Sequence, residues 1–291
     1  MPRTALSLIV AVGATIVGLP LLWFGGALAI QSLDVSGDSA SASASAVGPA
    51  LLALLGAAVL GAAGYSIRWS PVGALTVGGL HLLVSATALA FAPYDEGALP
   101  FLWQLVFDLD RAAPAISSGL AMTLAYGVSA LLGMALLVGG LVSLRPGRAT
   151  ALWRLVGVAG GLAAVVATLW TFTLGLRVYI AFLVTGQPDA AVITPLVVQL
   201  ALAVVVFGAA LVPLRWSAVG GFVAGIVLTG LGLLLIAPLP EILEALPSDV
   251  AFLVATIGPA GLLSSVGLTL LGVAAGSRRL RSHDQGTGAV G

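Results

Sequence analysis

One histidine stands out among the residues that could carry chemistry, because it lies in the middle of a long apolar stretch. His81 is part of GGLHLLVSATAL, and an ionisable group at that depth in a membrane is a functional candidate. Gly78 and Ser85 share its helical face at spacings of three and four residues. Two interpretations stay open: a neutral imidazole hydrogen-bonded to a neighbouring helix, or a residue that binds a substrate, a proton or a metal. No second histidine or acid lies in an apolar stretch, which counts against the metal.

Arg177 and three acids are further candidates. Arg177 follows an apolar run, 155–176, whose length of about 33 Å already crosses the hydrocarbon core. Snorkelling to the lipid headgroups explains this arginine, and anion binding at the mouth of a cavity is the alternative. Acids near the ends of apolar stretches would attract cations or a basic partner. The alternative is that they lie on the outer side of the membrane only because arginines are concentrated on the inner side. These acids are Asp108, Asp110 and Asp249.

The sequence motifs of common enzyme classes are not present in this chain. There is no cysteine, and HExxH, GxSxG and GxxxxGK[ST] are absent. A serine paired with His81 is the one conceivable nucleophile. The polar side chains that could accompany it are Thr76, Ser85 and Thr87 in the same span and Ser117, Ser118, Thr123, Tyr126 and Ser129 in the fourth span. We therefore expect no enzymatic activity, no cofactor and no metal. The arginines are spread over separate segments, so nucleic acid is not expected as a partner.

The elements that must position these residues are membrane-spanning helices. Hydrophobic residues make up 60% of the 291 residues and charged residues only 8%, which excludes an ordinary soluble domain. Apolar runs of about 20 residues or more predict transmembrane helices. Eight such runs are present: 5–30, 48–67, 71–92, 115–143, 152–176, 192–213, 217–237 and 250–275. The expected fold is an all-α polytopic membrane protein with eight spans.

The distribution of charge predicts the orientation. With the N-terminus inside, most arginines fall on the cytoplasmic side and most acids on the other. Both termini are therefore expected in the cytoplasm, and the location is the cytoplasmic membrane. The first run, 5–30, resembles a secretory signal, but it is too long for one and is expected to remain as a span.

A short motif repeats within the chain. Arg68-Trp69-Ser70 recurs as Arg215-Trp216-Ser217, 147 positions later (215 − 68), each between the second and third spans of its half. We expect two parallel four-helix repeats, 1–147 and 148–276, followed by a disordered cytoplasmic tail, 277–291. In this alignment Leu228 is the counterpart of His81. GxxxG patterns such as Gly157 to Gly161 predict close packing of helices, with a dimer interface as the alternative.

Function is less defined than architecture. The almost uncharged spans and short loops favour a scaffold or an accessory subunit of an envelope or transport complex. The alternative is a small secondary transporter or channel with a path between the two repeats, near His81 and Arg177. The expected partners are the lipid bilayer, with other membrane proteins or a second copy of the chain as candidates.

Overall fold

The chain folds as a bundle of α-helices. The computed structural model describes residues 2–32, 39–90, 108–145, 147, 150–185, 190–236 and 248–287, and within these ranges the regular structure is all helical. The α-helices are α1 (Arg3–Ser32), α2 (Ser39–Tyr65), α3 (Val72–Ala90), α5 (Pro114–Ala125), α6 (Val128–Leu144), α7 (Ala151–Thr185), α8 (Ala190–Leu211), α9 (Val219–Leu234), α11 (Ser248–Ile257) and α12 (Leu262–Thr287). Two 3₁₀ turns are η1 (Ser66–Arg68) and η2 (Val212–Arg215).

Several of these helices can cross a membrane. Four are long and apolar enough, and they lie in Arg3–Ser32, Val47–Arg68, Ala151–Ala181 and Ala191–Arg215. A fifth candidate is the bent pair α5 and α6. The chain is thus a helical, multi-pass membrane protein. The other predicted spans coincide with shorter elements: α9, with 16 residues, is only about 24 Å long.

The fourth predicted span, 115–143, is not one straight helix. It is broken between α5 and α6, whose axes differ by 62°. Gly127 at this break has φ of 70°, a backbone region that glycine adopts without steric cost. The eighth predicted span, 250–275, is likewise broken between α11 and α12, where Gly261 has φ of 67°. The α12 helix then continues to Thr287 and takes in most of the stretch expected to be a disordered tail.

Small residues face the inside of the bundle and large apolar residues face outward. Buried positions of α1 are mostly Gly, Ala and Ser, whereas Ile16 is 66% exposed. On other helices Leu83, Leu155 and Val166 are similarly exposed. Such a surface would be unfavourable in water and is suited to lipid contact.

Two helix crossings share one geometry. Where α3 meets α6, a Cβ on Gly78 would lie 2.8 Å from the carbonyl oxygen of Gly133. Where α9 meets α12, a Cβ on Gly225 would lie 2.8 Å from the carbonyl oxygen of Gly267. At both crossings the backbones touch because neither glycine has a side chain.

The glycines of the GxxxG patterns also pack within the chain. A Cβ on Gly161 would collide with Gly220, and one on Gly276 would lie 3.0 Å from the carbonyl oxygen of Tyr65. The prediction of close intramolecular packing is confirmed.

The two Arg-Trp-Ser turns also share one structure. In each, the tryptophan N–H donates to the carbonyl three residues earlier, at 3.1 Å for Trp69 and 3.0 Å for Trp216. In each, the serine Oγ accepts a hydrogen bond from the N–H two residues later, at 3.3 Å for both Ser70 and Ser217. Equal sequence has produced equal local structure.

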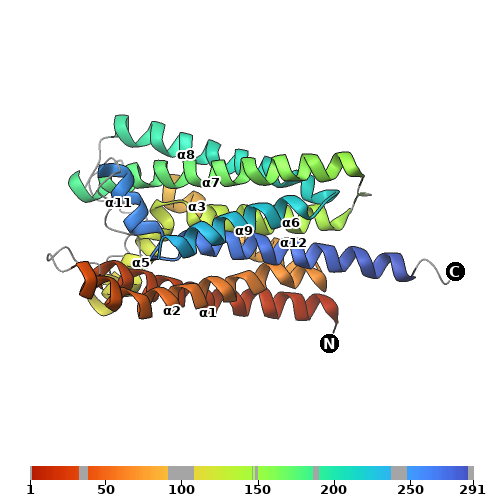
Figure 1. Ribbon diagram of the computed structural model, residues 1–291, viewed down its shortest axis with the longest axis horizontal. Coiled ribbons are helices and arrows are strands. Elements are labelled where there is room, and N and C mark those ends of the chain that lie inside the picture. Colours follow the sequence, from red (N-terminus) through yellow and green to blue (C-terminus); the bar gives the residue numbers. More distant parts are fainter. Residues whose placement is uncertain are drawn as a thin grey trace.

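The helices run along the long axis of the molecule, with α6 and α12 packed together inside it (Figure 1). The start of α1 and the end of α12 lie at the same end, and α5 and α11 lie at the opposite end (Figure 1). We divide the helices into two sets, one that contains α6 and one that contains α12. The first set is α1, α2, α3, α5 and α6, and the second set is α7, α8, α9, α11 and α12.

Candidate functional site

His81 is held between two helices of the first set. It follows Gly78 on α3, and the close approach at Gly133 brings its ring beside the start of α6. There the imidazole Nδ1 lies 2.9 Å from the Oγ of Ser129, a hydrogen bond between two buried side chains. The glycine crossing therefore creates the pair, because a larger residue at either position would separate the helices.

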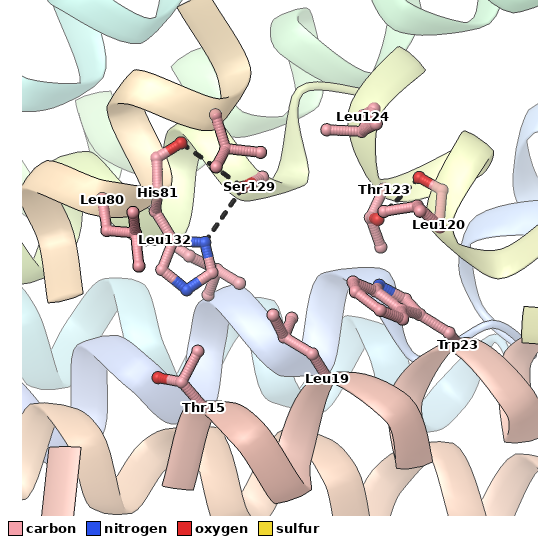
Figure 2. A pocket seen from close by; sticks show the side chains of 11 residues that line it. Thr15, Leu19, Trp23, Leu80, His81, Leu120, Thr123, Leu124, Ser129 and Leu132 are labelled. Atoms are coloured by element: carbon pink, nitrogen blue, oxygen red, sulfur yellow. Dashed lines mark hydrogen bonds between the residues drawn. The ribbon is translucent and has the colours of Figure 1, made fainter. Parts of the chain in front are cut away.

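The second ring nitrogen of His81 has no such partner. The residue is 5% exposed, and its Nε2 makes no hydrogen bond within the part of the chain that the structure describes. Figure 2 shows this nitrogen on the side of the ring turned away from Ser129 and toward α1. A buried polar atom without a partner is costly and calls for an explanation.

The unpaired nitrogen belongs to a residue that lines a cavity of about 160 Å³. Four helices of the first set, α1, α3, α5 and α6, form its walls. The lining residues are Thr15, Leu19, Trp23, Leu80, His81, Val84, Leu120, Thr123, Leu124, Ser129 and Leu132 (Figure 2). Most of them are apolar, so the cavity is an apolar space with a few polar groups, which is typical of small-molecule sites.

The polar groups of the lining residues differ in whether they have a hydrogen-bond partner. The hydroxyls of Thr15 and Thr123 donate to backbone carbonyls of their own helices, each at 2.9 Å. The indole Nε1 of Trp23 is buried and, among the described residues, has no hydrogen-bond partner. Among the described lining residues, the nitrogens without a hydrogen-bond partner are the Nε2 of His81 and the Nε1 of Trp23, and both atoms are fully buried.

The second set of helices carries leucines at the matching positions. His81 lies three residues after Gly78, and Leu228 lies three residues after Gly225. Ser129 lies four residues before Gly133, as Leu263 lies four residues before Gly267. Both leucines are fully buried in the hydrophobic core. At the crossing of α9 with α12, apolar side chains therefore fill these positions. At the crossing of α3 with α6, a polar pair occupies them.

The other predicted site residues do not join this cavity. Ser85 is buried one turn after His81, and its Oγ has no hydrogen-bond partner among the described residues, but it does not line the cavity. Arg177 is exposed on α7, in the second set. Asp108 and Asp110 are exposed in the helical residues 108–112. Asp249 lies in α11, and its side chain is outside the described part of the structure.

The arginines of the repeated turns contact aromatic rings. The guanidinium of Arg68 lies 3.9 Å from the ring centroid of Trp69, and that of Arg215 lies 5.3 Å from the ring centroid of Trp216. The Trp216 ring also stacks on Trp153, with centroids 3.9 Å apart and planes at 9°. These contacts stiffen the turns.

Sequence reasoning missed Trp23 as a cavity residue, because its position toward the end of a span predicts an interfacial ring. Ser129 is one of the hydroxyl residues of the fourth predicted span, and no sequence signal singles it out, because its contact with His81 depends on the crossing of α3 and α6.

Among the described residues, no group of three or more His, Cys, Asp or Glu side chains could hold a metal ion. No protein-family profile, curated protein or solved structure matches this chain.

Proposed function

We propose that the protein crosses the cytoplasmic membrane eight times as two parallel four-helix repeats with both termini in the cytoplasm. The repeat is supported by the matched crossings of α3 with α6 and α9 with α12, and by the matched turns at Trp69 and Trp216. The breaks at Gly127 and Gly261 support it as well. A pseudo-two-fold axis would pass between α6 and α12.

Within this architecture, the protein is a non-catalytic membrane component, a scaffold or accessory subunit of an envelope or transport complex. The observation that carries this proposal is the close packing between the two sets of helices. A Cβ on Gly64 of α2 would lie 2.6 Å from the carbonyl oxygen of Thr269 on α12. On the other side, a Cβ on Gly208 of α8 would lie 2.6 Å from the sulfur of Met134 on α6.

This packing counts against the alternative, a transporter with a path between the repeats. Such a path would run where α2 meets α12, where α8 meets α6 or where α6 meets α12, and backbones or side chains are in contact at all three places. His81 and its cavity lie inside the first set instead. Arg177, the other residue expected on the path, is exposed on α7.

The test is purification of the tagged full chain from its native membrane in mild detergent, with co-purifying proteins identified by mass spectrometry. An unrelated polytopic protein is the control for non-specific capture. A partner recovered in a fixed stoichiometric ratio supports the accessory role. Isolation of the chain alone, as a monomer or homodimer, contradicts it.

Variants sharpen this test. Replacing Arg68-Trp69-Ser70 and Arg215-Trp216-Ser217 by alanines is expected to reduce recovery of the partner, since both turns are structured elements on the predicted cytoplasmic side. Gly79→Ala is the matched control, because a Cβ at Gly79 meets nothing within 4 Å. Equal recovery from both variants would exclude the turns from the contact.

A further inference from the structure

We propose that the first Arg-Trp-Ser turn, together with an arginine of α12 beside it, binds the phosphate of an anionic phospholipid headgroup. The site consists of Tyr65, Arg68, Trp69 and Arg279. This inference requires that α2 crosses the bilayer, but it does not depend on eight crossings or on a protein partner.

The position of Arg68 along the chain matches the headgroup region. It is the last residue of the candidate span Val47–Arg68, whose 22 residues would extend about 33 Å and so cross the hydrocarbon core. Tyr65 and Trp69 on either side of it are half-buried, and such rings are enriched at the level of the headgroups. The guanidinium of Arg68 is therefore at the depth of lipid phosphates.

The protein holds one part of this guanidinium in place. Its carbon lies 3.9 Å from the ring centroid of Trp69 and 4.6 Å from that of Tyr65. Its Nη1 donates to the Tyr65 hydroxyl at 2.8 Å. These contacts fix the side chain of Arg68 before any ligand arrives, so binding of an anion orders little more of the protein.

Another part of the same guanidinium reaches the surface. The Nε of Arg68 is enclosed, but its Nη2 is not enclosed and makes no hydrogen bond with the described residues. Nη2 carries two N–H donors, and the Tyr65 hydroxyl, which accepts from Nη1, keeps its own hydrogen. Guanidinium groups bind phosphate through charge-assisted hydrogen bonds of this kind. The accessible donors thus suit a phosphate.

A second positive charge lies at the same tyrosine. The guanidinium carbon of Arg279 is 5.9 Å from the Tyr65 ring centroid, and Arg278 next to it is exposed. The acids whose side chains the structure describes, Asp108 and Asp110, directly precede α5, at the opposite end of the molecule (Figure 1). The arginines therefore give this corner a positive potential, which attracts an anionic headgroup.

The second Arg-Trp-Ser turn has different contacts. There the Nε of Arg215 donates to the carbonyl oxygen of Arg145 at 3.0 Å, and Trp216 stacks on Trp153. A segment of the protein thus packs against that turn. At the first turn the Tyr65 ring instead contacts arginines from η1 and α12. The two turns share a backbone structure but present different groups to the lipid.

The experiment is native mass spectrometry of the full chain in detergent, titrated with phosphatidylglycerol. Phosphatidylcholine with the same acyl chains is the matched control, because a choline cation balances its phosphate. A third arm adds glycerol phosphate, a soluble phosphate without acyl chains. We expect phosphatidylglycerol to bind more tightly than phosphatidylcholine, and glycerol phosphate not to displace it.

Single arginine variants locate the site. Arg68→Gln and Arg279→Gln are each expected to weaken the tightest phosphatidylglycerol site about fivefold. Arg154→Gln removes an equal charge from an exposed residue in the first turn of α7, beside the second Arg-Trp-Ser turn, and is expected to leave this affinity unchanged. The thermal unfolding midpoint of each variant is measured alongside. If Arg68→Gln unfolds the chain, Arg279→Gln decides the test, since that side chain is exposed.

Three results would overturn the proposal. Equal affinity for the two lipids would mean that the protein has no preference for an anionic headgroup. Equal weakening by Arg154→Gln and by the site variants would mean general attraction to positive charge without a defined site. Displacement of the lipid by glycerol phosphate would mean that the site takes a soluble phosphate.

Discussion

At the scale of single residues, His81 has one satisfied and one unsatisfied nitrogen. Ser129 pairs with Nδ1 at 2.9 Å, while Nε2 is buried without a partner among the described residues. Leaving such a group unpaired costs about 1–3 kcal/mol in general. Folding does not require this cost, because Leu228 and Leu263 fill the matching places at the other crossing. The stability of the fold therefore does not account for the polar pair.

Removing one member of the pair should be worse than removing both. Ser129→Ala leaves Nδ1 of His81 unpaired as well, so we expect a loss of about 1–3 kcal/mol in the free energy of unfolding. In the His81→Leu/Ser129→Ala double variant no imidazole remains to be satisfied, and most of that loss should be recovered. Thermal unfolding of the two variants and of His81→Leu completes a double-mutant cycle. A double variant less stable than Ser129→Ala would contradict the argument.

Part of the candidate site can be predicted from the sequence. His81 is recognisable because it is the one titratable side chain in the middle of an apolar run. Ser129 and Trp23 are 48 and 58 positions away (129 − 81 and 81 − 23), so their contact with the same cavity depends on helix crossings that no local pattern specifies. For Ser85 the sequence predicted too much: its spacing places it on the same helical face as His81, but it does not line the cavity.

At the scale of elements, glycine positions determine which helices touch. The α3 and α6 helices meet at Gly78 and Gly133, and the α9 and α12 helices at Gly225 and Gly267. Apolar run length predicts these helices, but it does not predict the break at Gly127. No proline marks that break, and Gly127, whose φ is positive there, is one of many glycines in the predicted spans.

Adjacent glycines on α3 should respond to alanine in opposite directions. A Cβ at Gly78 would lie 2.7 Å from the backbone nitrogen of Leu137, so Gly78→Ala must push α6 away and is expected to destabilise by about 1–3 kcal/mol. Gly79 faces open space, and Gly79→Ala should be neutral or stabilise by up to about 1 kcal/mol through helix propensity. Thermal unfolding in detergent measures both, and a similar midpoint for the two variants would disprove this account of the crossing.

At the scale of the whole molecule, composition predicts a membrane protein and leaves the number of crossings to be measured. Four helices qualify as spans by length and apolar character, and the bent pair α5 and α6 makes a fifth candidate. The remaining predicted spans include α3 and α9, which are shorter, and segments that reach outside the described residues. Eight crossings therefore remain a prediction that rests on run length, charge and repeat.

Labelling of single cysteines tests this topology directly. Ser43→Cys and Ser282→Cys are expected to react with a membrane-impermeant thiol reagent from opposite sides of the membrane, because an odd number of crossings separates them in the eight-span arrangement. The chain contains no cysteine, so no background residue needs removal. Labelling of both sites from one side would exclude eight spans with both termini inside.

The stack of Trp153 on Trp216 has an optical consequence. Two indole rings with centroids 3.9 Å apart and planes at 9° have strongly coupled electronic transitions. The pair should therefore contribute an exciton couplet to the circular dichroism of the protein in the ultraviolet. Because Trp153 lies in the first turn of α7 and Trp216 directly follows η2, that couplet would report whether this corner of the bundle is assembled, without any added label.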